Sequence, residues 1–156
     1  FYGILAKNPD YTKSVLAIDR DVAKPRKDIA RFSEVKEYFE YMFEELFTPA
    51  YELPENIAKE DAVAFLEAYK NAYNPEDDRQ AWFDRIKEIA PTIGFAAETK
   101  QYKADPDSYK GHAGDLSTVL RIAVTGRRNT PDLCSIMQVL GKDKCIARIN
   151  NLISNI

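Results

Sequence analysis

The sequence predicts an all-α protein, and three observations lead to that fold class. Apolar residues recur along most of the 156-residue chain at the three- and four-residue spacing of amphipathic helices. No segment of five or more residues alternates apolar and polar side chains between turn signals, so no strand is predicted. Six glycines are few for a turn-rich β architecture, and 45% hydrophobic residues indicate a folded protein rather than a disordered one.

The N-terminal part predicts two helices separated by a proline. Asn8-Pro9-Asp10 caps and starts a helix that runs to about Asp19. Pro25 disfavours helix at the residue before it. Ser33 is expected to cap a longer amphipathic helix, because apolar residues follow it at helical spacing. Those apolar residues are Val35, Tyr38, Phe39, Met42, Phe43 and Leu46.

The middle of the chain predicts two further helices. The first covers about residues 59–73, and the second opens at Asn74-Pro75-Glu76-Asp77-Asp78, where a cap, a proline and three carboxylates form a strong N-terminal signal. We interpret these carboxylates as charges in a first helical turn rather than as a metal site. The chain is divided here into two packed helical subdomains, residues 1–73 and 74–156.

Two amphipathic helices joined by a basic turn are predicted between residues 114 and 141. The first begins near Asp115. The turn consists of Gly126, Arg127, Arg128 and Asn129. Thr130 is expected to cap the second helix, which carries Leu133 in its buried stripe, and a third helix follows. Two arginines beside a helix N-terminus, where backbone N–H groups point outward, suit a phosphate or a base edge.

Charge is distributed unevenly along the chain. The net charge is −3, but residues 110–156 carry seven basic and three acidic residues, a net of +4. Residues 1–109 therefore carry 15 basic and 22 acidic residues, a net of −7. A basic end on an acidic body suits a protein that touches nucleic acid with one surface. No apolar run of eighteen residues and no signal-peptide pattern occurs, so no membrane span is predicted.

No catalytic or metal-ligating residue is predicted. His112, the only histidine, lies in a flexible stretch without a nucleophile pattern, and we expect a surface residue or a loop-to-core hydrogen bond there. Glycine-rich phosphate-binding motifs are absent from the sequence. Cys134 and Cys145, with one histidine, cannot form the usual four-ligand zinc site, so we expect free thiols in a reducing cytosol.

Three short motifs follow one another in the C-terminal half. They are Leu120-Arg121-Ile122-Ala123-Val124-Thr125-Gly126, Thr130-Pro131-Asp132-Leu133 and Leu140-Gly141-Lys142. With Trp82 and Gly94-Phe95-Ala96 upstream, their order and spacing resemble the C-terminal anticodon-binding region of bacterial-type glutamyl-tRNA synthetases. A weaker similarity at residues 24–28 extends the resemblance over most of the chain.

The resemblance implies part of a glutamate–tRNA ligase, a class I aminoacyl-tRNA synthetase that attaches glutamate to its tRNA. Such enzymes use ATP, with Mg²⁺, on a catalytic domain marked by an H-x-G-H motif and a K-M-S-K-S-like loop, and neither motif occurs in this sequence. We therefore expect this chain to be catalytically inactive alone, to need no cofactor, and to begin at Phe1 inside a longer protein. The expected setting is a cytoplasmic monomer whose partner is tRNA, not DNA or a membrane.

The resemblance also assigns roles to single residues. Arg26 is expected to read the third anticodon base through its guanidinium fork, and the alternative is a plain ion pair with Asp28. Thr130 and Leu133 match positions that contact splayed anticodon bases. Without the resemblance, these two residues are interpreted as a helix cap and a core residue.

Two alternatives stay open at this stage. Arg127 and Arg128 are expected to contact phosphates, which position an RNA without specifying its sequence, but both also fit a solvated turn. A different class of function is a helical protein–protein interaction module whose basic turn is incidental. If the ligase interpretation holds, the sequence leaves open whether the whole enzyme charges glutamate tRNA only or glutamine tRNA as well.

Overall fold

A computed structural model of the chain describes residues 1–20, 22–25, 29 and 31–156. Throughout these residues the regular structure is helical, and the single β-type contact is a parallel bridge between Ala96 and His112. The predicted all-α fold class is confirmed. A search of the described helices finds none long and apolar enough to cross a membrane.

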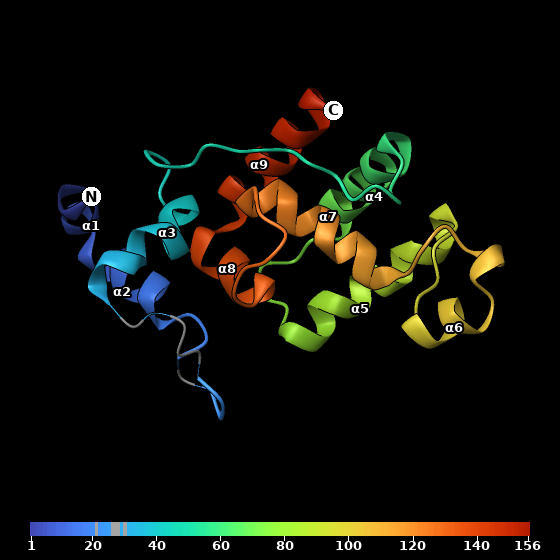
Figure 1. Cartoon of the computed structure of the whole chain (residues 1–156), viewed down its shortest axis with the longest axis horizontal. Helices are drawn as coiled ribbons and strands as arrows, with labels where there is room; N and C mark the ends of the chain where they lie inside the picture. Colours follow the sequence, from blue (N-terminus) through green and yellow to red (C-terminus); the bar gives the residue numbers. More distant parts are fainter. Residues whose placement is uncertain (21, 26–28, 30) are drawn as a thin grey trace.

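Figure 1 shows the helices in chain order. The α-helices are α1 Tyr2–Lys7, α2 Pro9–Ala17, α3 Val35–Phe39, α4 Lys59–Ala72, α5 Arg79–Ile89, α6 Thr99–Ala104, α7 Ala113–Thr125, α8 Leu133–Leu140 and α9 Lys142–Asn155. Short 3₁₀ turns cover Phe32–Glu34, Glu40–Met42, Ala90–Ile93 and Pro106–Ser108.

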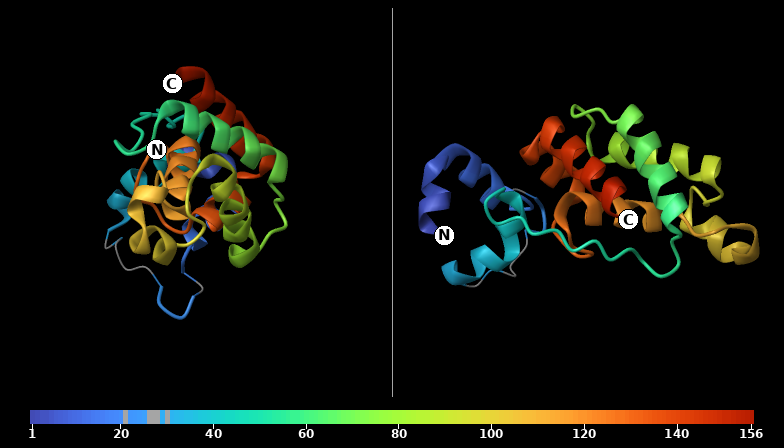
Figure 2. Two further views of the ribbon diagram at one scale, coloured as in Figure 1. Left: turned by 90° about the vertical axis from the view of Figure 1, so that its right-hand side faces the viewer. Right: turned by 90° about the horizontal axis from the view of Figure 1, so that it is seen from above.

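The helices gather in two groups of unequal size. Helices α4, α5, α7, α8 and α9 pack on one another, whereas α1, α2 and α3 lie together at one end (Figures 1 and 2). The segment 43–58 runs between the two groups, and α2 contacts α8. The division at residue 74 stays a prediction, but the packing places α4, which precedes that residue, with the helices that follow it.

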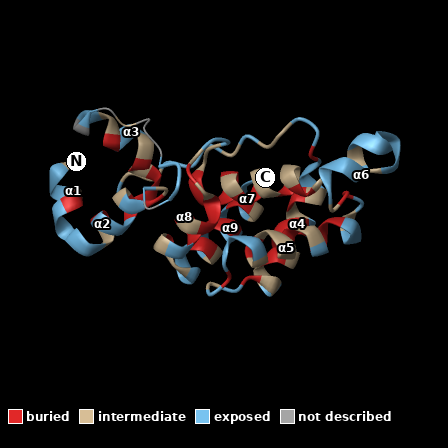
Figure 3. Cartoon of the chain, turned by 90° about the horizontal axis from the view of Figure 1, so that it is seen from below, coloured by how far each residue is buried: buried red, intermediate tan, exposed pale blue. Residues whose placement is uncertain are grey.

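The hydrophobic core is one cluster that is densest between the helices of the larger group and extends into the smaller one through Leu5, Val15 and Phe39, as the buried residues in Figure 3 show. Helix α7 buries one apolar stripe, each member of which is at most 2% exposed. Its members are Leu116, Val119, Leu120 and Ala123. Helices α4 and α8 bury apolar faces as well. These faces are Ala62, Phe65, Leu66, Tyr69 and Tyr73 in and beside α4, and Leu133, Ile136, Met137 and Leu140 in α8.

The long helix predicted from Ser33 is wrong in its length. A 3₁₀ turn precedes α3, Ser33 does not cap it, and α3 ends at Phe39. Backbone carbonyls that a longer helix would use internally are taken by distant side chains. Arg148 donates to the carbonyl oxygen of Tyr41 at 2.8 Å, and the Tyr11 hydroxyl donates to that of Met42 at 2.5 Å. Tertiary hydrogen bonds therefore replace the helical ones in this segment.

Helix starts also differ from some predictions. Asn8 does cap α2, accepting from the Tyr11 backbone N–H at 3.1 Å. The cap of α5, however, is Asp78, whose carboxylate accepts from Ala81 N–H at 2.8 Å, so α5 begins after the acidic cluster and not within it. Within that cluster Asp77 is buried and accepts two hydrogen bonds from the Arg85 guanidinium. Its charge is therefore neutralised by an ion pair rather than by the helix dipole.

Candidate nucleic-acid interface

The turn between α7 and α8 is shaped at its first residue. Gly126 ends α7 in a left-handed conformation, with φ of 69°, and its N–H donates to the Ile122 carbonyl at 2.8 Å. A Cβ at Gly126 would lie 3.4 Å from Pro49 Cα, so the turn packs closely against segment 43–58. Thr125 accepts from the Arg127 backbone N–H at 3.1 Å. These contacts fix the direction in which the chain leaves α7.

The Arg121 side chain fixes the middle of this turn by hydrogen bonds to Thr130 and Pro131. Its guanidinium donates to the Thr130 hydroxyl, to the Thr130 carbonyl at 3.3 Å and to the Pro131 carbonyl at 2.8 Å. The prediction that Thr130 caps α8 is wrong, because its hydroxyl serves the turn itself and donates to the Pro131 carbonyl at 2.9 Å. Arg121 belongs to the motif that ends at Gly126, and the sequence alone predicted no role for it.

The N-terminus of α8 is occupied by carboxylates. Asp132 is its cap and accepts from the Ser135 N–H at 2.9 Å. The Asp132 N–H donates in turn to the Asp19 carboxylate at 2.9 Å, and Arg79 lies 3.2 Å from Asp132 and 3.7 Å from Asp19. Asp19 has a positive φ of 58°, which aspartate tolerates better than most residues. A phosphate at this helix end would meet two negative charges, so the predicted use of the α8 N-terminus does not fit.

The two arginines of the turn have different surroundings. Arg127 donates to the Glu37 carbonyl at 2.6 Å and to the Glu40 carboxylate at 2.9 Å, and its guanidinium lies 5.2 Å from the centre of the Tyr41 ring. Arg128 is exposed, and within the described part of the chain its side chain has one hydrogen bond, to the Leu53 carbonyl at 3.2 Å. Arg127 therefore joins the turn to the N-terminal helices, whereas Arg128 keeps most of its donors toward solvent.

The remaining predicted site residues lie elsewhere or outside the description. Leu133 is 1% exposed, which fits the core interpretation that the sequence left open. Arg26 lies outside the described residues. The structure thus brings Thr130, Arg127 and Arg128 together on one turn and places Leu133 beneath it.

His112 and the cysteines take structural positions. His112 caps α7, where its Nδ1 accepts from the Gly114 N–H at 3.0 Å, a local bond rather than the loop-to-core hydrogen bond expected from the sequence. Cys134 and Cys145 are free and buried, and burial raises the pKa of each thiol to about 11. No group of three or more His, Cys, Asp or Glu side chains in the described part of the chain is placed to hold a metal ion.

These features define a class of protein: a helical domain that presents an arginine-bearing turn where two groups of helices meet. Residues 5–153 match the family model of the anticodon-binding domain, and the chain belongs to that family. The resemblance seen in the sequence is therefore confirmed at the level of the family.

Several relatives are named glutamate–tRNA ligases. The chain is 41% identical over 150 residues to the protein from Acetivibrio thermocellus, 40% over 148 residues to that from Sorangium cellulosum, and 40% over 152 residues to that from Clostridium perfringens strain 13. These alignments cover 96%, 94% and 95% of the chain but only 28%, 26% and 28% of the relatives. The chain thus spans little more than a quarter of their length. No solved structure gives a significant match.

Proposed function

We propose that this chain binds the anticodon loop of a glutamate-accepting tRNA, as the C-terminal part of a glutamate–tRNA ligase. The observation that carries the proposal is the family match over residues 5–153, together with relatives of that name near 40% identity. The whole ligase would join glutamate to tRNA with ATP and Mg²⁺. Because the H-x-G-H and K-M-S-K-S-like motifs are absent from this sequence, we assign this chain tRNA selection and not the chemistry.

The geometry of the turn supports particular roles. Thr130 is half-buried on the turn, and bonds to Arg121 and Pro131 hold its hydroxyl in place, so a base edge would meet the acceptor capacity that these bonds leave. Arg128 is exposed and suits a phosphate, whereas Arg127 has only the N–H groups left over from its bonds to Glu37 and Glu40. Leu133 would reach a base only if the turn opened. We assign it to the support of the turn.

Arg26 is the residue that we propose to read the third anticodon base. We propose that Arg26 meets the Watson–Crick edge of this base, where an unpaired cytosine offers O2 and N3 as acceptors and guanine presents a donor at N1. The third anticodon base is cytosine in glutamate tRNA and guanine in glutamine tRNA, so the enzyme should prefer glutamate tRNA. The proposed setting is a cytoplasmic monomer that engages tRNA and neither DNA nor membranes, consistent with the net negative charge and the local basic end.

Binding of this chain to tRNA transcripts tests the proposal. We expect it to bind a glutamate tRNA more tightly than the same transcript with its three anticodon bases replaced. Equal affinity for the two, or no binding of either, would contradict the proposal. Glutamate-dependent pyrophosphate exchange by the chain alone, cleared of host synthetase, would show that it is more than a binding region.

Salt dependence separates the two arginines. Affinity should fall with added salt, because phosphate contacts release counterions, and each contact contributes about one unit to the slope of log K against log salt. Arg128→Ala should flatten that slope for every transcript alike. Arg127→Ala should flatten it less. A loss confined to one anticodon sequence would mean that Arg128 reads bases.

Discrimination at the third base tests Arg26. In the complete ligase, Arg26→Gln should reduce the preference for cytosine over guanine at that position, where a wrong base costs about 1–3 kcal/mol. Charging rates of two transcripts that differ only at this base give the measurement. If the wild type and Arg26→Gln discriminate equally, Arg26 does not read the base and the ion-pair alternative is supported.

A further inference from the structure

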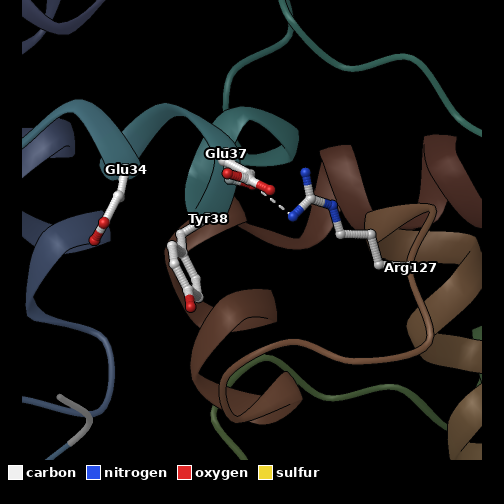
Figure 4. Close-up of a pocket in the computed structure, with 4 residues that line it drawn as sticks. All are labelled: Glu34, Glu37, Tyr38 and Arg127. Atoms are coloured by element: carbon white, nitrogen blue, oxygen red, sulfur yellow. Dashed lines mark hydrogen bonds between the residues drawn. The ribbon is translucent and has the colours of Figure 1, made fainter. Parts of the chain in front are cut away.

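A hollow of about 380 Å³ lies between α3 and the turn that follows α7. Its lining residues come from both groups of helices: Glu34, Glu37 and Tyr38 from one side and Arg127 from the other. Figure 4 shows Tyr38 pointing from α3 into this space, with Arg127 facing Glu37 across it. The volume is in the range of sites that bind small molecules, and Arg127, which lines the hollow, directly precedes Arg128 on the turn after α7.

One wall of the hollow is rigid before any ligand arrives. The Arg127 guanidinium is held by the Glu37 carbonyl at 2.6 Å and the Glu40 carboxylate at 2.9 Å, and its side chain is 32% exposed. Two elements far apart in sequence are thereby joined at a fixed spacing. A wall that is already ordered costs no further conformational entropy when something binds against it.

The opposite side offers an acceptor and an aromatic face. Among the described residues, the Glu37 carboxylate and the Tyr38 hydroxyl have no hydrogen-bond or ion-pair partner. Glu34 is engaged, because it accepts from the Arg31 backbone N–H at 3.1 Å. Tyr38 is half-buried and packs against the core, so its ring is supported from behind. The hollow therefore combines a fixed guanidinium, a supported ring and a carboxylate open to a donor.

The charges in the hollow select which part of a nucleic acid fits it. Arg127 is balanced by Glu40, so the Glu37 carboxylate adds a negative charge at the edge of the space, which disfavours a phosphate there. A carboxylate accepts from an exocyclic amino group, whereas uracil presents its one ring N–H between two carbonyl oxygens that a carboxylate repels. Aromatic side chains stack on any unpaired base.

We propose that this hollow receives one unstacked base that carries an exocyclic amino group, with Tyr38 as the stacking surface and Glu37 as the acceptor. The inference rests on the proposed function and deepens it, because it adds a base subsite that is separate from Arg26 and from the phosphate contacts. Arg127 acts here as a positioning residue that holds the two walls together.

The experiment combines base scanning with matched protein variants. The probe is the anticodon stem-loop RNA of a glutamate tRNA, in which each amino-bearing loop base is replaced in turn by uracil. Wild-type protein should lose about ten- to a hundred-fold in affinity at one position. Glu37→Gln should remove that dependence, because an amide can also donate to a uracil carbonyl. Glu88→Gln, an exposed change on α5 far from the hollow, is the matched control.

Variants of Tyr38 test the stacking surface separately. Tyr38→Phe keeps the ring and should bind the unaltered stem-loop as the wild type does, whereas Tyr38→Leu should bind about ten-fold or more weakly. Tyr109→Leu, beside α6 at the far end of the molecule, controls for loss of a tyrosine, and thermal melting checks that each variant folds.

The outcomes separate the two proposals. If the wild type binds the stem-loop but Glu37→Gln keeps the same dependence at every position, the subsite is wrong and the proposed function stands. Weak binding by Tyr38→Phe, or wild-type binding by a folded Tyr38→Leu, likewise overturns the subsite. If the wild type does not bind the stem-loop, both proposals fall together.

Discussion

The contacts inside the larger group of helices differ in kind from those that join the smaller group to it. In the larger group, α4, α7 and α9 meet through fully buried apolar side chains. The smaller group of α1, α2 and α3 shares the same apolar cluster, and charged side chains also tie it to the larger group by hydrogen bonds to backbone atoms across the boundary. Arg148 and Arg127 supply two of these ties, and Asp19 supplies the third.

Arg148 shows how strong such a tie can be. It is 4% exposed, donates to the Tyr41 carbonyl at 2.8 Å and the Val124 carbonyl at 2.7 Å, and pairs with Glu44. Its guanidinium also lies 3.8 Å from the centre of the Phe47 ring. The comparison teaches that apolar burial is densest in the larger group, whereas at the boundary with the N-terminal helices it is supplemented by directional contacts such as those of Arg148 and Arg127. Removing apolar volume from the larger group should therefore destabilise the whole protein. Removing a boundary contact such as that of Arg148 should chiefly loosen α1, α2 and α3.

The largest expected effect is in the apolar body. Phe65 on α4 is fully buried, so Phe65→Ala should destabilise the whole protein by about 3–5 kcal/mol through lost burial and a residual cavity. Denaturant unfolding should show one transition at a lower midpoint. A loss below about 1 kcal/mol would mean that the core is not packed around this ring.

The next largest effect should fall on the boundary. Arg148→Met keeps much of the side-chain volume but leaves the Tyr41 and Val124 carbonyls without their donor, at a cost of about 2–4 kcal/mol. Hydrogen exchange should accelerate in α1–α3 more than in α4. Equal acceleration in both groups would contradict the distinction between them.

A smaller effect is expected at the turn. Gly126→Ala places a Cβ on a residue with φ of 69° and should cost about 1–2 kcal/mol. Gly3→Ala is the matched control, because a Cβ at Gly3 meets nothing within 4 Å and alanine favours helix α1. If both variants have the same unfolding free energy, the left-handed conformation at Gly126 carries no cost for alanine.

The smallest effect is a loss of stability at alkaline pH. Burial raises the folded-state pKa of Cys145 to about 11 from 9.0, so the unfolded chain releases this proton first. The stability that depends on the neutral thiol is complete below pH 9 and is lost as pH rises toward 11. Between pH 8 and 10 the loss should be about 1 kcal/mol. The Cys145→Ser variant should show a shallower decline, and an identical decline would contradict the assignment.

The same contrast explains what the sequence could predict. Helices α4, α7 and α8 follow apolar periodicity because each buries one continuous stripe, so spacing alone locates them. The helix predicted from Ser33 fails because Arg148 and Tyr11 capture its carbonyls, and these residues are distant in sequence. Helices α1 and α6, six residues each, carry too little periodicity to be recognised.

The sequence predicted which residues share the turn better than it predicted the contacts that they make. The motif residues Thr130, Arg127 and Arg128 do share one turn, as their closeness in sequence requires. Asp132 could have been predicted as the cap of α8, because aspartate is a common cap, but Thr130 gave an equally good capping signal. The contact of Asp19 with the Asp132 N–H spans 113 residues, and no local pattern indicates it.

Mapping where the chain covers its RNA tests the central claim most directly. Nuclease protection of a full-length glutamate tRNA should show a footprint on the anticodon loop, weakened by added salt and by Arg128→Ala. The acceptor stem should stay fully cleavable in the presence of this chain. Protection centred on the acceptor stem, or protection unchanged when the anticodon bases are replaced, would contradict anticodon recognition.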